Sequence, residues 1–168
     1  MIVGLIDVDG HNFPNLALMK LSAWHKAQGD TVEWWSGFGE YDLVYMSKVF
    51  DETYSPDAME PVNTRQIIKG GTGYGLENRL PNEVEHIYPD YSLYPELTKE
   101  TAYGFLTRGC PRACDFCIVA GKEGRQSVKV ADLSEWWSGQ KRIELLDPNL
   151  LACRDHMDLL GQLANSGA

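Results

Sequence analysis

The stretch with the clearest capacity for chemistry runs from Thr107 to Cys117 and reads TRGCPRACDFC. It holds three of the chain's four cysteines, Cys110, Cys114 and Cys117, in a CxxxCxxC spacing. The thiolate form of cysteine is a soft ligand that selects zinc, copper(I) or iron–sulfur clusters. A disulfide uses two thiols and a closed structural zinc site uses four ligands, so three clustered thiols leave a remainder that needs an explanation.

The spacing allows three interpretations. A four-iron cluster has four corners, usually with one cysteine each, so three cysteines would leave one iron open to a substrate or cofactor. A four-cysteine zinc site would need the distant Cys153, and CxxxCxxC is uncommon among zinc motifs, which favour paired cysteines on tight turns. Free thiols are the third interpretation. Outside a zinc site, the expected role of Cys153 is that of a small buried side chain.

The longer stretch GFLTRGCPRACDFCIV, residues 104–119, resembles the radical S-adenosylmethionine (radical SAM) superfamily, and in particular its members that carry a cobalamin-binding domain. The resemblance implies that Cys110, Cys114 and Cys117 hold a [4Fe–4S] cluster whose open iron binds S-adenosylmethionine. One electron from the cluster would then cleave the sulfonium and yield a 5′-deoxyadenosyl radical that abstracts a hydrogen atom. The cofactors carry this chemistry, and the protein supplies their placement.

The same resemblance implies contacts to S-adenosylmethionine, while no catalytic side chain is assigned. Phe116, between the last two cysteines, would pack against the adenine. The end of the next strand in such barrels commonly contacts the methionine amino group, and here that position reads LLDPN, which makes Asp147 and Asn149 candidates. An equal alternative for Asp147 is a cap or turn before Pro148.

The N-terminal half resembles cobalamin-binding domains at three separated places. The stretch DGHNFP puts His11 where these domains carry Asp-x-His-x-x-Gly, whose histidine is the lower cobalt ligand, although Pro14 replaces the final glycine. Ser47 matches their serine after the third strand, and Gly70 and Gly71 match a glycine pair near the nucleotide tail. Cobalamin is therefore a further expected cofactor. The alternatives are a locally hydrogen-bonded histidine and glycines that serve a turn or a close backbone approach.

The elements that must position these residues follow an α/β pattern. Strands are expected over residues 2–8, 31–35, 41–47 and 65–71, with a further strand near 84–89. A helix is expected over residues 15–29. Its expected buried face consists of Leu16, Met19, Ala23 and Ala27.

The second half repeats the alternation of strand and helix. Strands are expected over residues 101–109 and 141–149, and helices over 130–140 and 153–167. Asp132 and Glu135 stand in the capping-box spacing at the start of the first of these helices. Alternating strands and helices predict a parallel sheet with helices packed on it.

A boundary near residues 95–101 gives two expected domains. Residues 1–98 would form a Rossmann-like, cobalamin-binding-type α/β domain with its linker, and residues 99–168 the N-terminal part of a radical SAM domain. A closed (β/α) barrel takes about 250 residues, so we expect only its first βα units here, truncated within the barrel. Open sheet edges then predict self-association.

Charge limits the classes of partner. The chain has 168 residues, with 24 acidic and 15 basic side chains and a formal net charge of −9. This excess of negative charge argues against non-specific binding to nucleic acid or to an anionic membrane. Because no targeting or membrane-spanning segment is recognisable and the thiols are clustered, the expected location is a reducing cytoplasm. The expected partners are small-molecule cofactors and an unknown substrate.

Two classes of function follow. The first is an iron–sulfur enzyme of radical SAM type that cleaves S-adenosylmethionine reductively to start radical chemistry on an unknown substrate. The alternative is a non-catalytic scaffold or regulatory domain that binds zinc or an iron–sulfur cluster. A module that binds cobalamin or its nucleotide tail is compatible with the first.

Overall fold

The computed structural model describes residues 1–10 and 12–168 and divides into two compact units, Met1–Tyr94 and Pro95–Ala168. The first unit contains a four-stranded sheet, and the second contains a two-stranded parallel sheet and a short antiparallel pair. His11, the expected cobalt ligand, lies outside the described residues.

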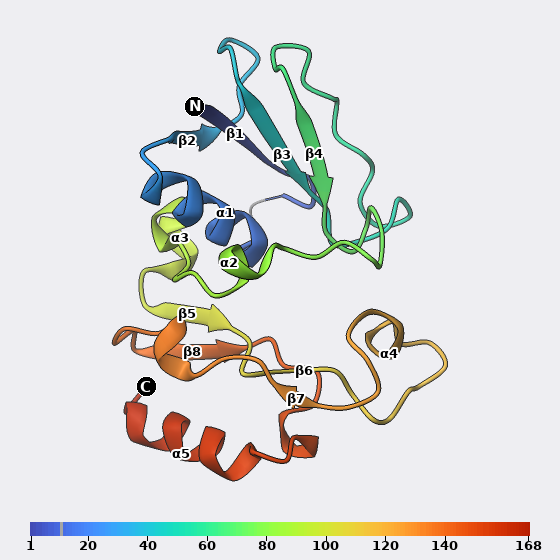
Figure 1. Ribbon diagram of the computed structural model, residues 1–168, viewed down its shortest axis with the longest axis vertical. Coiled ribbons are helices and arrows are strands. Elements are labelled where there is room, and N and C mark those ends of the chain that lie inside the picture. Colours follow the sequence, from blue (N-terminus) through green and yellow to red (C-terminus); the bar gives the residue numbers. More distant parts are fainter. Residues whose placement is uncertain (11) are drawn as a thin grey trace. The chain divides into compact units, whose positions relative to one another are not determined.

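Four parallel strands form the sheet of the first unit in the order β2-β1-β3-β4 (Figure 1). They are β1 (Ile2–Asp7), β2 (Thr31–Trp34), β3 (Leu43–Ser47) and β4 (Ile67–Gly70). The mixed α/β class and the parallel sheet predicted from the sequence are confirmed. Since β2 and β3 lie on opposite sides of β1, the strand order reverses between β1 and β3. Ligands of such sheets usually bind outside the carboxyl ends of the strands at this point.

One face of the sheet is covered by α1 (Leu16–Ala27). The helix begins where Asn15 accepts a hydrogen bond from the backbone N–H of Leu18 at 3.3 Å, a side-chain cap that satisfies an otherwise unpaired donor. Leu18 and Leu21 pack against Val3 and Leu5 of β1 in a buried apolar cluster. The helix therefore fixes the orientation of the loop that precedes it.

The buried face predicted for this helix is wrong. Of its four residues only Met19 is buried, and Ala27 is exposed. The buried face contains two polar side chains, Ser22 and His25. A search for apolar residues at helical spacing therefore could not identify this face. The Ser22 hydroxyl donates to Asp90 at 2.6 Å, and His25 Nδ1 lies 2.7 Å from Asp30. The buried residues of the helix are Leu18, Met19, Lys20, Leu21, Ser22 and His25.

Short elements complete the first unit. The strand expected near residues 84–89 is wrong, because this segment begins with a helical turn, α2 (Asn82–Glu85). Val84 in this turn is buried in the cluster beneath α1. A 3-10 turn, η1 (Tyr91–Leu93), follows.

The loop after β4 packs tightly on the loop after β3. Gly71 has a φ of +94°, and a Cβ on it would lie 2.2 Å from the carbonyl oxygen of Lys48. The N–H of Gly73 donates to that same oxygen at 2.9 Å. Close approach of two backbones is therefore sufficient to explain why glycine follows this strand.

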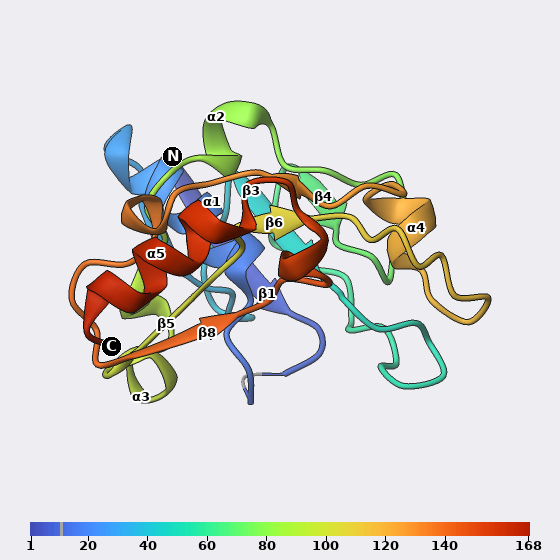
Figure 2. The ribbon, with the colours of Figure 1, turned by 90° about the horizontal axis from the view of Figure 1, so that it is seen from below.

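The second unit pairs β5 (Thr101–Gly104) in parallel with β8 (Arg142–Leu145), and the two lie side by side in Figure 2. In the sequence, β6 (Thr107–Arg108) and β7 (Val128–Lys129) come between β5 and β8 and pair with each other in antiparallel fashion. The remaining elements are α3 (Pro95–Thr98), α4 (Val119–Lys122), η2 (Leu133–Glu135), η3 (Leu150–Ala152) and α5 (His156–Ser166).

Two expectations for this unit need correction. The single strand predicted over residues 101–109 is two strands, β5 and β6. The helix predicted over residues 130–140 is only the 3-10 turn η2. The capping box at its start is confirmed, with Glu135 accepting from the backbone N–H of Asp132 at 2.9 Å.

In the described part of the chain, every helix falls short of the length and apolar character that crossing a membrane requires. The cobalamin-binding type of the first sheet, and the membership of β5 and β8 in a barrel, stay predictions.

Replacing Gly71 by alanine is expected to lower the free energy of unfolding by at least about 1–3 kcal/mol, because the left-handed backbone and the contact with Lys48 both oppose a Cβ. Gly70→Ala is the matched control, since a Cβ there meets nothing within 4 Å, and it should stay within about 0.5 kcal/mol of the parent. Urea unfolding followed by circular dichroism measures both. Equal stability of the two variants would contradict the packing role of Gly71.

Candidate functional site

The three clustered cysteines lie in residues 109–127, here called the cysteine loop, which β6 and β7 close at its base. Thr107 pairs with Lys129 and Arg108 with Val128 in the antiparallel ladder. The loop therefore leaves and re-enters the fold at neighbouring points.

Gly109 makes the tight entry into the loop. Its φ is +85°, and a Cβ would lie 2.1 Å from the carbonyl oxygen of Gln126. The next residue, Cys110, donates its backbone N–H to the carbonyl oxygen of Gly124 at 3.1 Å. The first cysteine is thus held against the returning end of the loop.

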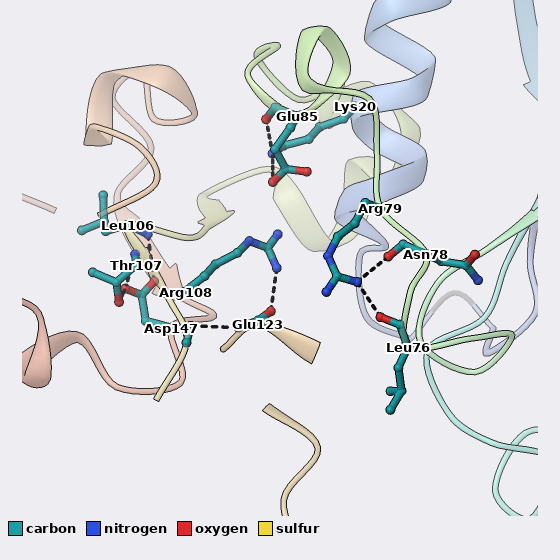
Figure 3. Close-up of polar contacts among 11 residues, drawn as sticks. Lys20, Leu76, Asn78, Arg79, Glu85, Leu106, Thr107, Arg108, Glu123 and Asp147 are labelled. Carbon is teal, nitrogen blue, oxygen red and sulfur yellow. Dashed lines mark hydrogen bonds and ion pairs between the residues drawn. The ribbon is translucent and has the colours of Figure 1, made fainter. Parts of the chain in front are cut away.

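Glu123 connects the two ends of the loop. One carboxylate oxygen accepts from the Arg108 guanidinium at 2.8 Å and the other from the backbone N–H of Gly109 at 3.2 Å (Figure 3). The guanidinium also lies over the ring of Phe105, 3.8 Å from its centroid. Sequence reasoning missed Glu123, because its partners lie fourteen and fifteen positions earlier, outside any local motif.

Asp147, just beyond β8, fixes the chain between β5 and β6. Its carboxylate accepts from the backbone N–H groups of Leu106 and Thr107 at 2.9 and 2.7 Å, and from the Thr107 hydroxyl at 2.5 Å (Figure 3). This role lies within the fold. Contact of Asp147 with S-adenosylmethionine stays a prediction.

Asn149 reaches the first cysteine. Its side-chain amide nitrogen lies 3.5 Å from the sulfur of Cys110, and its backbone oxygen accepts from the Ser127 hydroxyl at 2.8 Å. The Asn149 amide lowers the pKa of the Cys110 thiol. The backbone N–H and the positive charge of Arg112 act in the same direction, and burial opposes them. This thiol therefore ionises more readily than an ordinary cysteine, and the thiolate is the form that binds metals.

The other two cysteines of the motif differ in their surroundings. Cys114 and Cys117 are exposed, and the N–H of Cys117 donates to the carbonyl oxygen of Cys114 at 3.0 Å. Phe116 between them is 92% exposed. Cys153 is buried, which confirms the position expected for it. All four thiols are free.

An iron–sulfur cluster needs several thiolates gathered around its irons. Across residues 1–10 and 12–168, no three His, Cys, Asp or Glu side chains are gathered closely enough to hold a metal ion. The chemistry of the loop nevertheless fits a cluster, because three free thiols lie within one loop, two of them exposed and the third with a lowered pKa. Cluster binding requires these thiols to converge.

Two of the four positions that resemble a cobalamin site, Ser47 and Gly71, contact other parts of the chain. The buried hydroxyl of Ser47 exchanges hydrogen bonds of 3.0 and 3.3 Å with Asn15, the cap of α1. The buried carboxylate of Asp7 accepts from the Tyr94 hydroxyl at 2.6 Å. Gly71 lies against Lys48, as described above, whereas the space beside Gly70 is open. Side chains from the carboxyl ends of β1 and β3 therefore bond within the fold.

Comparisons with known proteins give one partial similarity. Over 79 residues the chain is 32% identical to the tRNA-2-methylthio-N(6)-dimethylallyladenosine synthase of Bordetella petrii. The matched stretch covers 42% of this chain and 16% of that enzyme. The chain thus matches about a sixth of the length of this relative. No protein-family model and no solved structure gives a significant match.

Asp147→Asn is expected to destabilise the second unit by about 1–3 kcal/mol, because an amide N–H would then face a backbone donor. Glu144→Gln is the matched control, since this carboxylate lies on the exposed side of β8. Thermal unfolding of both variants tests the difference. An Asp147→Asn protein as stable as Glu144→Gln would show that the bonds to residues 106 and 107 do not hold this part of the fold.

Proposed function

We propose that the chain is an iron–sulfur protein of radical SAM type. Cys110, Cys114 and Cys117 would hold a [4Fe–4S] cluster, with one iron open to S-adenosylmethionine. The observation that carries the proposal is the CxxxCxxC motif with free thiols on the cysteine loop, which lies in the sequence between β5 and β8, the two strands of the parallel pair. An open iron requires three cysteines rather than four, which matches this motif.

The partial similarity supports the same reaction type. The Bordetella petrii relative is named as a methylthio-adenosine synthase, and such methylthiotransferases belong to the radical SAM superfamily. The matched stretch is too short a part of that enzyme to bring its tRNA substrate to this chain.

The chain's own residues would position the cofactors. Bound together here, the cluster and S-adenosylmethionine would supply a one-electron cleavage of the sulfonium that starts radical chemistry. Gly109 and Glu123 fix the entry of the cysteine loop, and Asn149 holds the first thiol. The exposed ring of Phe116 is available to stack on an adenine.

Methylthio transfer is not part of the proposal. That reaction adds sulfur to its substrate and needs a sulfur donor. The similarity covers 16% of the relative, which is too little to bring its sulfur-transfer step to this chain. We therefore assign the chain reductive cleavage of S-adenosylmethionine, with a substrate of unspecified class.

We also propose that the first unit acts without cobalamin. The support is the internal bonding of Ser47 with Asn15 and of Asp7 with Tyr94, together with the packing of Gly71 on Lys48. These side chains are thus engaged within the fold at the strand ends, where ligands of such sheets usually bind.

Cys114→Ala is expected to abolish cluster assembly. Only two cysteines of the motif would remain, so a second iron, besides the open one, would lack a protein ligand. Iron and acid-labile sulfide are measured after anaerobic reconstitution. Cys153→Ala is the matched control and should keep the iron content of the parent. Cys153 lies outside the motif in the sequence, and its thiol is buried whereas Cys114 and Cys117 are exposed. Iron retained by Cys114→Ala would show that the ligands are assigned wrongly. Stoichiometric zinc in place of iron would support the scaffold interpretation.

Hydroxocobalamin added to the protein should leave its visible spectrum unchanged and should not co-elute with the protein in gel filtration. A spectral shift that saturates at one corrinoid per chain, and that Ser47→Ala weakens, would refute the proposal for the first unit.

A further inference from the structure

We propose that Asn149 is a positioning residue for the cluster, and that its side-chain amide donates a hydrogen bond to the sulfur of Cys110 and raises the reduction potential. The inference rests on the proposed function for the presence of the cluster. It gives Asn149 a role different from the contact with S-adenosylmethionine that the sequence resemblance implies.

The geometry singles out one thiol of the three. The Asn149 amide nitrogen lies 3.5 Å from the Cys110 sulfur, within the range of an N–H···S bond. In the described part of the chain, no side-chain hydrogen bond reaches the sulfurs of Cys114 and Cys117, which are exposed. Cys110 therefore has a side-chain partner from outside the cysteine loop, which distinguishes it from Cys114 and Cys117.

The Asn149 amide belongs to the segment after β8 and not to the cysteine loop. Asp147, two residues earlier, is tied to Leu106 and Thr107, and Pro148 restricts the backbone between them. The backbone oxygen of Asn149 accepts from the Ser127 hydroxyl at 2.8 Å. Anchors on both sides of Asn149 limit how far its side chain can withdraw from Cys110.

A donor at this position has a defined electrostatic consequence. Reduction adds negative charge to a cluster, and a hydrogen bond donated to a ligand sulfur stabilises that added charge. The donor therefore makes the cluster easier to reduce. Since the proposed reaction begins with the reduced cluster, the amide favours the state that acts.

The test compares the midpoint potentials of reconstituted variants. Asn149→Leu removes the donor at similar volume, and Asn149→Asp keeps the shape but replaces the amide by a carboxylate. Both should give midpoint potentials more negative than the parent, with Asn149→Asp the lowest, at unchanged iron content. Asn149→Gln, which keeps an amide, should lie closer to the parent. The control Asn165→Leu changes an exposed asparagine of α5 and should leave the potential as it is.

A potential equal to that of the parent in Asn149→Asp would overturn the proposal, even if Asn149→Leu folds poorly. A second readout tests the role of Asn149 separately from the proposed function. In the metal-free protein, the side-chain amide signal of Asn149 in a ¹⁵N–¹H spectrum should shift in Cys110→Ala and not in Cys114→Ala. Failure of the parent to bind iron would refute the proposed function, whereas an amide signal insensitive to Cys110 would refute the role of Asn149.

Discussion

The hydrogen bonds of the Asp147 carboxylate are the constraint on which the candidate site depends. They join the segment just beyond β8 to Leu106, which lies between β5 and β6, and to Thr107, which begins β6. The cysteine loop starts two residues later. Parallel pairing of β5 with β8 brings these ends to the same edge of the sheet. From there Asn149 meets Cys110, so one thiol of the motif is placed by the fold while two remain at the surface.

Sequence reasoning located the four strands of the first sheet, the parallel pair β5 and β8, and the two longer helices, because apolar runs and turn residues mark them locally. It missed β7, which has two residues and pairs with β6 about twenty positions earlier. It failed where the deciding contact is distant. The buried face of α1 includes Ser22 and His25, which are buried because Asp90 and Asp30 pair with them. The segment near Val84 has the apolar side chains of a strand, but without a neighbouring strand it forms one helical turn.

The candidate site shows the same division. The CxxxCxxC motif is visible in the sequence, and so is a polar pair, Asp147 and Asn149, at the end of a strand. What each polar side chain contacts could not be predicted, since the partners lie about forty positions away. Glu123 gave no signal at all, because an acidic residue between Lys122 and Gly124 reads as part of a solvated loop.

The carboxyl ends of β3 and β4 show how residues that resemble a ligand site can serve the fold instead. A serine at the end of β3 and glycines at the end of β4 match a cobalamin-binding pattern, yet Ser47 and Gly71 each have a task within the fold. Ser47 bonds the cap of α1, and Gly71 lets two loops approach. Small and polar residues at the carboxyl ends of parallel strands serve both the packing of loops and the binding of ligands. Their presence alone therefore does not distinguish the two uses.

The central claim is a four-iron cluster with an iron that S-adenosylmethionine can reach. The most direct measurement is the EPR spectrum of anaerobically reconstituted, dithionite-reduced protein, recorded with and without S-adenosylmethionine. We expect a four-iron signal whose g-values shift when S-adenosylmethionine is added. The account would be contradicted by a four-iron signal that stays unchanged when S-adenosylmethionine is added. It would also be contradicted by the absence of a four-iron signal in protein that contains zinc in place of iron.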